Sequence, residues 1–484
     1  MATLYSPASA YNSPGPGADR PLRGPLVVSR SNPRYFADPS GRIVYLTGSH
    51  TWDNLVDFGP PTPAFDFSSY LEFLKQHNHN FIRLWRREST RPVSKAPAYI
   101  APLPWERTGP GDANDGLPKF DLAKFNEEYF QRLRSRVVQA GRQGIYVSIM
   151  LFNRFIDWHT HPFNPANNIN GINGDVNSDG DGREIHTFAS PHVANIQVAY
   201  VKKVVNAVND LDNVLFEIGN ELRRDTLEWQ LSMIELIRNH EKQLAKQHPV
   251  GMTSTGASPE AISNAELLES PADWISPRNE LGQDYSYDPP EANGDKVILA
   301  DTDHLTGVLE TPTPDWVWKS FLRGLNPILM DLIQNRAPGH TEKWNEPDRP
   351  FVRETRQAMG QTRALAVRID LKRMVPASHL ASTGYCLANP GLEYLVYLPI
   401  GSHPLESFVT SLSERLGNRL TQLEMFSPTA SLQLPANRER YEVEWFDPDT
   451  DKIIAADAIT ANGTHKFTAP FRGAAVLYVR RSTS

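Results

Sequence analysis

The sequence predicts a (β/α)8 barrel followed by a small antiparallel β-sandwich. From residue 43 onward, apolar strand patterns alternate with helical patterns eight times, which is typical of a barrel of parallel strands. After about Leu380 the helical periodicity ends, and short alternating segments separated by turn residues replace it. A length of 484 residues accommodates one large barrel and one small domain.

The barrel strands are expected at short runs of apolar residues. These runs are 43–50, 81–85, 146–152, 214–221, 250–255, 272–276, 297–304 and 326–331. Amphipathic patterns between them predict helices at 121–143, 191–211 and 225–247, and Asp121 is the expected N-cap of the first. The helix at 315–323 is short, and the connection 277–296 is expected to be a loop.

The sandwich is expected to occupy about the last 100 residues. Its strands are predicted at 394–398, 431–434, 441–446, 465–467 and 474–479. A long helix at 353–372 leads into it and is expected to close the barrel. The predicted organisation is a flexible arm over residues 1–24, a barrel over 25–379 and a sandwich over 380–484.

Composition excludes several classes of partner and site. Hydrophobic residues make up 40% of the chain, and ten tryptophans are ample for a sizeable core. The net charge of −7 gives no reason to expect nucleic acid or an anionic membrane surface as a partner. The single cysteine, Cys386, excludes an intrachain disulfide and a thiolate metal cluster, and we expect it to be buried in a strand. No run of roughly 18 apolar residues predicts a membrane span.

The first 23 residues are rich in Pro, Gly, Ser and Ala and lack the apolar core of a secretion signal. The sequence therefore leaves the location open: extracellular or periplasmic if a leader has been removed, and otherwise cytoplasmic.

The segment Val214-Leu-Phe-Glu-Ile-Gly-Asn-Glu221 carries the most functional information. Its apolar residues fit a central strand covered on both faces, and the strand ends in Asn220 and Glu221. In a barrel of parallel strands, catalytic groups lie at the C-terminal strand ends. A carboxylate there costs free energy unless it does chemistry or is paired. Glu221 is therefore a candidate catalytic residue; the alternative is a strand-end Glu that caps the next loop.

The seventh strand offers a second carboxylate. It reads Val297-Ile-Leu-Ala-Asp-Thr-Asp-His304, and Asp301 and Asp303 share a parity, so both are expected to face the barrel mouth. Two carboxylates flanking a pocket are the minimum set for glycoside hydrolysis, because one protonates the leaving oxygen and the other attacks the sugar or activates water. We expect one of the two Asp residues to be structural and to hold His304, Arg83 or Arg278.

Other strand ends also carry polar or aromatic side chains that would converge on one rim. The candidates for substrate binding are His50, Trp52, Arg83, Trp85, Asn153, Asn220, Arg278 and His304. Further polar residues at strand ends are Arg154, Asn279 and Asp331. Tryptophan rings suit the C–H faces of sugars, although Trp316 and Trp318, which open a helix, fit core packing equally well. The loop that carries Tyr285 and Tyr287 is a candidate pocket wall.

Three segments resemble known families. Gly219-Asn220-Glu221 after an apolar strand resembles the acid/base motif of clan A glycoside hydrolases. Residues 34–50, followed by Trp52, resemble the first strands of apiosidase-like barrels. Residues 388–391, 394–399 and 441–448 resemble the small sandwich often fused to those barrels, a domain family whose name refers to collagen binding. Together these resemblances cover about residues 26–481.

The resemblance implies roles for individual residues. Glu221 takes the general acid/base role, Asn220 binds a sugar hydroxyl beside the reacting carbon, and Arg83 steadies the nucleophile. Clan members usually carry Glu on the seventh strand, whereas this chain has Asp301 in the best-aligned position and Asp303 two residues on. Asp is shorter, so the carboxylate gap is expected to widen from about 5–5.5 Å toward the roughly 6.5–9.5 Å of inverting enzymes. We nevertheless favour retention, which is usual for the clan, and we favour Asp301 as the second carboxylate.

The segment Asp175-Val-Asn-Ser-Asp-Gly-Asp181 resembles a calcium loop. Asp175, Asn177, Asp179 and Asp181 occupy ligand positions 1, 3, 5 and 7, and a glycine occupies the sixth. The twelfth position, acidic in a complete loop, is a histidine here, and Glu184 is the nearest substitute. A structural Ca²⁺ and a polar surface loop both remain open. No redox or catalytic cofactor is expected.

Three functions are consistent with the sequence. The leading one is a glycoside hydrolase acting on a plant or microbial polysaccharide or oligosaccharide. The second is another carbohydrate enzyme on the same barrel, a transglycosylase or a lyase. The third is a carbohydrate-binding protein without catalysis, which the missing Glu on the seventh strand would fit. The sequence leaves open the sugar, exo or endo action, and the oligomeric state.

Overall fold

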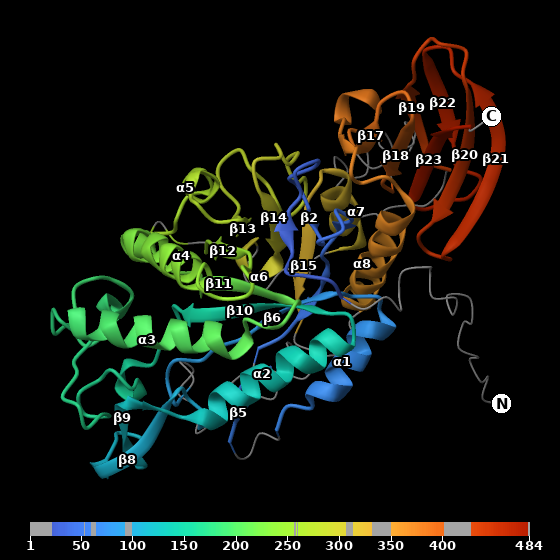
Figure 1. Ribbon diagram of the computed structural model, residues 1–484. Helices are drawn as coiled ribbons and strands as arrows, with labels where there is room; N and C mark the ends of the chain where they lie inside the picture. The colour runs from blue at the N-terminus through green and yellow to red at the C-terminus, as the bar shows by residue number, and fades with distance from the viewer. Residues whose placement is uncertain are drawn as a thin grey trace, which may run out of the picture.

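The computed structural model describes residues 22–52, 54–59, 64–91, 99–255, 258, 260–305, 313–331, 350–400 and 427–482. It contains a barrel of parallel strands surrounded by helices, with the C-terminal strands to one side beside α7 and α8 (Figure 1). The expected arm over residues 1–24 lies almost entirely outside the described residues.

Eight parallel strands form the barrel sheet. In chain order they are β4 (Gly48–His50), β6 (Phe81–Leu84), β10 (Tyr146–Asn153), β11 (Val214–Asn220), β12 (Val250–Thr253), β13 (Trp274–Ser276), β14 (Val297–Asp301) and β15 (Asn326–Met330). Their order in the sheet is β4-β15-β14-β13-β12-β11-β10-β6. All eight expected strands are therefore present, although the first begins at Gly48, because residues 43–44 belong to a separate strand.

The two ends of this sheet meet and close the barrel. The backbone N–H of Asn80 donates to the carbonyl of Thr47 at 2.9 Å, and the Thr47 N–H donates to Asn80 Oδ1 at 3.0 Å. Beside them, a Cβ at Gly48 would overlap the carbonyl oxygen of Phe81. Glycine at this position is required because the two backbones approach too closely for a side chain.

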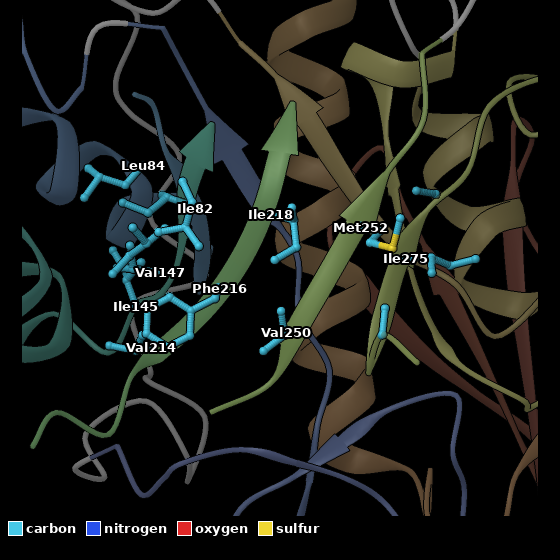
Figure 2. Close-up of a cluster of buried hydrophobic side chains, with 14 of the residues drawn as sticks. Ile82, Leu84, Ile145, Val147, Val214, Phe216, Ile218, Val250, Met252 and Ile275 are labelled. Carbon is cyan, nitrogen blue, oxygen red and sulfur yellow. The ribbon is translucent and has the colours of Figure 1, made fainter. Parts of the chain in front are cut away.

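The core has an inner and an outer layer. Inside the barrel, Phe81, Tyr146 and Leu215 near the strand starts pack with Phe36 and Val44. The last two belong to three short antiparallel strands, β1 (Val27–Val28), β2 (Phe36–Ala37) and β3 (Ile43–Val44), which therefore cover the N-terminal end of the barrel. The opposite strand faces form the outer layer; Figure 2 shows part of it, including Ile82, Val147, Phe216, Ile218 and Val250.

The helices surround the sheet. They are α1 (Phe67–Gln76), α2 (Glu127–Arg142), α3 (Pro191–Val208), α4 (Leu227–Glu241), α5 (Asn264–Glu269), α6 (Thr302–Leu305), α7 (Pro314–Leu322) and α8 (Pro350–Arg368). Helix α3 shows why they begin where they do. Ser190 caps it by accepting from the N–H of Val193, and Pro191 occupies the first turn, where its missing N–H costs nothing.

The helix expected at 121–143 is shorter than predicted. It begins at Glu127, and the N-cap is Asn126 rather than Asp121. Asp121 lies in β9 (Pro118–Phe125), which pairs with β8 (Trp105–Asp112) in an antiparallel hairpin that was not predicted. Tertiary pairing overrides the helical pattern here: β9 also contacts the loop after β10, where the amide of Asn170 donates to Asp121 Oδ1.

The C-terminal part is a two-layer antiparallel structure. One layer has six strands in the order β16-β17-β18-β23-β20-β21, and the other is the pair β19–β22. Their bounds are β16 (Val375–Pro376), β17 (Cys386–Asn389), β18 (Glu393–Leu398), β19 (Thr429–Gln433), β20 (Arg440–Asp447), β21 (Lys452–Thr460), β22 (Thr464–Thr468) and β23 (Ala475–Arg481). Cys386 is buried in β17, as expected. The sheet begins at Val375, slightly before the boundary expected at residue 380.

The C-terminal sheet packs on the barrel through α7 and α8. Trp318 of α7 stacks on Tyr397 with ring centroids 5.9 Å apart, and the Tyr397 hydroxyl donates to Asp315 Oδ1 at 3.1 Å. On α8, Arg368 donates to Glu444 Oε2 at 2.8 Å. Trp318 is thus a packing residue. Within the described residues, no helix combines the length and apolarity needed to cross a membrane.

Candidate active site

Arg83 is the centre of a buried polar cluster at the C-terminal end of the barrel strands. It points from β6 into the barrel, and all five of its N–H groups are used. Nε and Nη2 donate to the two carboxylate oxygens of Glu217 at 2.8 and 2.6 Å. Nη2 also donates to Asn220 Oδ1 at 2.6 Å. Nη1 donates to Asp301 Oδ2 at 3.1 Å and to Asp303 Oδ2 at 3.0 Å. Arg83 therefore ties the fourth barrel strand to the seventh and keeps no donor for a ligand.

Glu217 is not among the site residues predicted from the sequence. It lies in the middle of β11, is fully buried, and faces the barrel interior with a two-point ion pair to Arg83. The signal was present, because a charged residue inside an otherwise apolar strand needs a buried partner. The apolar pattern of that strand predicts its burial but does not by itself identify Glu217 as a site residue.

Asp301, at the end of β14, has both oxygens engaged. Oδ1 accepts from the backbone N–H of Asp303 at 3.0 Å and lies 2.9 Å from His50 Nε2, and Oδ2 accepts from Arg83. His50 Nδ1 accepts from the Trp85 indole at 2.9 Å, so its Nε2 carries the hydrogen that points to Asp301. Burial would raise the pKa of Asp301, but His50 and Arg83 outweigh burial and hold this pKa well below its usual range.

Asp303 does not lie in a strand, which corrects the expectation that it shares parity with Asp301 on the seventh strand. The strand ends at Asp301, and residues 302–305 form the helical turn α6. This turn still directs the carboxylate toward Arg83, at 3.0 Å through Oδ2. No described residue hydrogen-bonds Asp303 Oδ1. Burial raises the pKa of Asp303, Arg83 counteracts this, and the charge of Asp301 raises it further, to about 6.

Glu221 follows directly after β11 in an unusual backbone conformation. Its φ of 53° lies in the left-handed region, which non-glycine residues seldom adopt and which often marks a functional site. The turn is held by Thr253, whose Oγ1 accepts from the Glu221 N–H at 3.2 Å and donates to the Gly219 carbonyl at 3.0 Å. A Cβ at Gly219 would lie 2.6 Å from the side chain of Leu222, so a larger residue there would require Leu222 to move.

The Glu221 carboxyl group is buried beside a second carboxylate. Oε2 accepts from the Thr255 hydroxyl at 2.7 Å, and the residue is 9% exposed. Burial raises its pKa first, and the charge of Asp303 raises it further, to about 8, against smaller lowering effects of Thr255, Arg154 and Arg83. At neutral pH, Glu221 is therefore protonated while Asp303 is mostly ionised. Such a pair is the usual electrostatic arrangement of a general acid and its partner.

Asn220 and His304 complete the cluster. Asn220 Oδ1 accepts from Arg83 and lies 3.2 Å from His304 Nε2, while His304 Nδ1 lies 2.7 Å from Ser276 Oγ. Burial and the nearby Arg83 hold the pKa of His304 well below its usual range, so the ring is neutral. The amide Nδ2 of Asn220 is buried, and no described residue accepts from it. It is an available donor beside Glu221.

The two tryptophans expected at the mouth differ. Trp85 is buried, its indole donates to His50, and Arg83 lies 5.0 Å from its ring centroid. Trp52 is only partly buried and meets Trp85 edge-on at 6.3 Å. Trp85 is therefore part of the site's framework, whereas the Trp52 side chain keeps part of its surface exposed. In the predicted pocket-wall loop, Tyr285 is buried and Tyr287 is 60% exposed.

Two predicted binding residues lie outside the cluster. Asn153 is fully buried, its Nδ2 donates to the Arg86 carbonyl and its Oδ1 accepts from the Phe155 N–H. It stabilises the loop after β10. Arg278 donates to Glu280 Oε1 at 3.1 Å and to the Ser258 carbonyl at 3.1 Å, and neither Asp301 nor Asp303 contacts it.

The predicted calcium loop brings together a different set of oxygens from that expected. Carboxylate oxygens of Asp175, Asp179 and Glu184 lie within 4.8 Å of one another. Asn177 joins them, because its Nδ2 donates to Asp179 at 2.9 Å and to Glu184 at 2.6 Å. Asp181 instead pairs with Arg183 at 2.7 Å.

Glu184 is the member of this group that would gain most from a cation. Burial raises its pKa, and the charges of Asp179, Asp181 and Asp175 raise it further. Its Oε2 is buried, and no described residue hydrogen-bonds it. A set of carboxylate and amide oxygens is the type that Ca²⁺ prefers. The loop joins β10 to α3, at the same end of the barrel as Glu221.

Solved structures of glycoside hydrolases share this fold. One structure, described as "Glycoside hydrolase", matches with a TM-score of 0.58 and 14% identity, covering 95% of this chain and 98% of that one. A glycoside hydrolase family 5 structure from Bacteroides vulgatus ATCC 8482 matches with a TM-score of 0.58 and 13% identity, covering 95% and 93%. Both matches extend over barrel and C-terminal strands. At this identity they show the architecture.

A family model described as "Domain of unknown function (DUF6298)" matches residues 75–287. This range contains Arg83, Glu217, Asn220 and Glu221, but not the two Asp residues of the seventh strand and α6. No match is found among the curated proteins.

Proposed function

We propose that this protein is a glycoside hydrolase in which Glu221 is the general acid/base and Asp303 is the second carboxylate. The observation that carries the proposal is the placement of two buried carboxyl groups, Glu221 directly after β11 and Asp303 in α6, at the C-terminal end of the barrel strands. Burial and the charge of Asp303 raise the pKa of Glu221 to about 8. A carboxylic acid that stays protonated at neutral pH can donate its proton to a glycosidic oxygen. The fold shared with solved glycoside hydrolases supports the proposal by analogy.

Asp303 replaces Asp301 as the preferred second carboxylate. Both oxygens of Asp301 are held by His50, Arg83 and backbone, and it is 1% exposed. Asp303 is 7% exposed, keeps Oδ1 free of hydrogen bonds from the described residues, and lies close enough to Glu221 to raise its pKa. Asp301 is then a positioning residue, which fits the expectation that one of the two would be structural.

The chemistry follows a double displacement. Asp303 Oδ1 attacks the anomeric carbon while Glu221 gives its proton to the leaving oxygen, so one C–O bond forms and the glycosidic C–O bond breaks. Glu221, now ionised, then takes a proton from water, which attacks the same carbon and releases Asp303. Arg83 positions both Asp carboxylates, and the free Nδ2 of Asn220 donates to a sugar hydroxyl.

The proposed substrate is a plant or microbial polysaccharide or oligosaccharide. The partly buried ring of Trp52 supports this, because aromatic rings pack against the C–H faces of sugars. The resemblance of residues 34–50 to apiosidase-like barrels would place the enzyme among those that act on polysaccharide side chains. We further propose that the loop oxygens of Asp175, Asp179 and Glu184 bind a structural Ca²⁺ that orders the rim.

The test is digestion of a glycan panel by the wild type and by Glu221→Gln, Asp303→Asn and Asp301→Asn, with products followed by NMR. Release of reducing sugar that collapses in Glu221→Gln supports the proposal, and the first anomer released distinguishes retention from inversion. Full activity in Glu221→Gln would refute it. New glycosidic bonds would indicate a transglycosylase, unsaturated products a lyase, and binding without cleavage a carbohydrate-binding protein.

A further inference from the structure

Arg154 is unusual among the arginines at the catalytic end of the barrel. Most of the others have internal anionic partners: Arg83 pairs with Glu217, Arg223 with Asp225, Arg224 with Glu266 and Arg278 with Glu280. Arg154 is half-buried, and no hydrogen bond or ion pair joins its guanidinium to any residue that the structure describes. A half-buried cation without a partner loses hydration and gains nothing in return. Such a group is a candidate for binding an external anion.

The backbone places Arg154 beside the proposed general acid. Its N–H donates to the carbonyl of Asn220 at 3.1 Å, directly before Glu221 in the chain. This bond continues the register in which Asn153 of β10 lies opposite Asn220 of β11. The charge of Arg154 reaches Glu221, whose pKa it lowers, yet the two side chains form no ion pair. The guanidinium is therefore near the site and still available.

The carboxylates of the site outnumber the cation that pairs with them, so a further cation is needed if the substrate is negatively charged. Glu217, Asp301 and Asp303 all pair with the same guanidinium, that of Arg83, and no other Lys or Arg of the described residues forms an ion pair with them. A neutral sugar needs no further compensation, but a sugar with a negative substituent would be repelled by this excess of carboxylates. A free guanidinium beside Glu221 offsets this repulsion between the carboxylates and an anionic sugar. Its planar fork of donors also matches the two oxygens of a carboxylate or sulfate.

We infer that Arg154 selects a substrate that carries an anionic substituent on one of the two sugar units flanking the cleaved bond. The substituent is a uronic acid carboxylate or a sulfate ester. This inference rests on the proposed function and names its substrate class. Arg154 acts as a specificity residue, and the proton transfer remains with Glu221.

The experiment compares matched oligosaccharides as substrates and as ligands. Oligogalacturonides and glucuronate-containing oligosaccharides are the carboxylate probes, sulfated galactan oligosaccharides are the sulfate probes, and neutral galactan oligosaccharides are the reference. Cleavage is measured with the wild type, Arg154→Gln and Arg154→Lys. Binding is measured by calorimetry in the Glu221→Gln background, where the ligand is not consumed. Arg224→Gln is the matched control, because it removes the same charge from a guanidinium already paired with Glu266 on the same rim.

For anionic probes, Arg154→Gln is expected to raise KM and Kd roughly ten- to hundredfold, the usual effect of losing a hydrogen bond to a charged group. Neutral probes should change little, Arg154→Lys should recover part of the loss, and wild-type affinity for anionic probes should fall with added salt. The arm that responds, carboxylate or sulfate, identifies the substituent. Melting temperatures near the wild-type value would show that the variants fold.

The inference is overturned if the wild type treats neutral and anionic probes alike, if no anionic probe binds, or if Arg154→Gln affects all probes equally. Cleavage of anionic glycans that depends on Glu221 but not on Arg154 would remove this inference and leave the proposed function intact. Cleavage that survives Glu221→Gln would remove the proposed function itself.

Discussion

Arg83 and Glu217 form a two-point ion pair inside the barrel, Nε to Oε2 at 2.8 Å and Nη2 to Oε1 at 2.6 Å, with both side chains buried. The same guanidinium holds Asp301 and Asp303 through Nη1. The orientation of the two Asp carboxylates therefore depends on a glutamate located on a different strand. Glu217 fixes Arg83, and Arg83 fixes the carboxylates of the seventh strand and α6.

Truncation of Glu217 should destabilise the protein strongly. Glu217→Ala leaves the buried Arg83 charge with fewer partners, and the expected loss in free energy of unfolding is about 3–5 kcal/mol. Urea denaturation measures it. Arg224→Gln, which breaks an ion pair with an exposed arginine, should cost at most about 1 kcal/mol and serves as the control. A loss below about 1 kcal/mol in Glu217→Ala would show that Arg83 is held by its other partners alone.

Activity should follow a bell-shaped pH profile. Glu221 must be protonated, so activity is lost as the pH rises through about 8; Asp303 must be ionised, so activity is lost as the pH falls through about 6. The charged groups acting on Glu221 are Asp303, which raises its pKa, and Arg154 and Arg83, which lower it. Arg154→Gln should therefore move the alkaline limb to higher pH. The dependence of kcat/KM on pH tests this, and an unmoved alkaline limb would contradict the assignment of that limb to Glu221.

The two Asp residues should respond differently to amide substitution. Asp303→Asn removes the proposed nucleophile and should lower kcat by several orders of magnitude with little change in stability. Asp301→Asn breaks the contacts with His50 and Arg83 and should lower the free energy of unfolding as well as activity, since it disturbs a buried network. Single-turnover kinetics and urea denaturation separate the two effects. Equal stability losses in both variants would weaken the distinction between them.

The sequence predicted the barrel because each apolar run and each amphipathic helix is a local pattern. It also placed Glu221, Asp301 and Arg83 at strand ends, since the carboxyl ends of parallel strands share one rim. The network itself was beyond such reasoning. Two features depend on which side chains meet across the barrel. Arg83 uses all five donors inward, and Asp303 lies in a helical turn.

Two misses have definite causes. Glu217 was overlooked because the strand around it is otherwise apolar, although that contrast was itself the signal. The second half of β9 is predicted as the start of a helix because its partner strand β8 lies earlier in the chain, and Asp121 resembles an N-cap when considered alone.

Calcium should stabilise the protein through the loop after β10. If Asp175, Asp179 and Glu184 bind Ca²⁺, a concentration 100-fold above Kd adds about 2.7 kcal/mol to the free energy of unfolding. Thermal unfolding with Ca²⁺ and with a chelator measures the effect.

Glu184→Gln should abolish the stabilisation by Ca²⁺, because Glu184 supplies the carboxylate oxygen that has no hydrogen-bond partner among the described residues. Asp181→Asn is the matched control and should retain it, because that carboxylate pairs with Arg183. Equal stability with Ca²⁺ and chelator would show that the loop is held by its own hydrogen bonds, and loss of the effect in Asp181→Asn would return that residue to the ligand set.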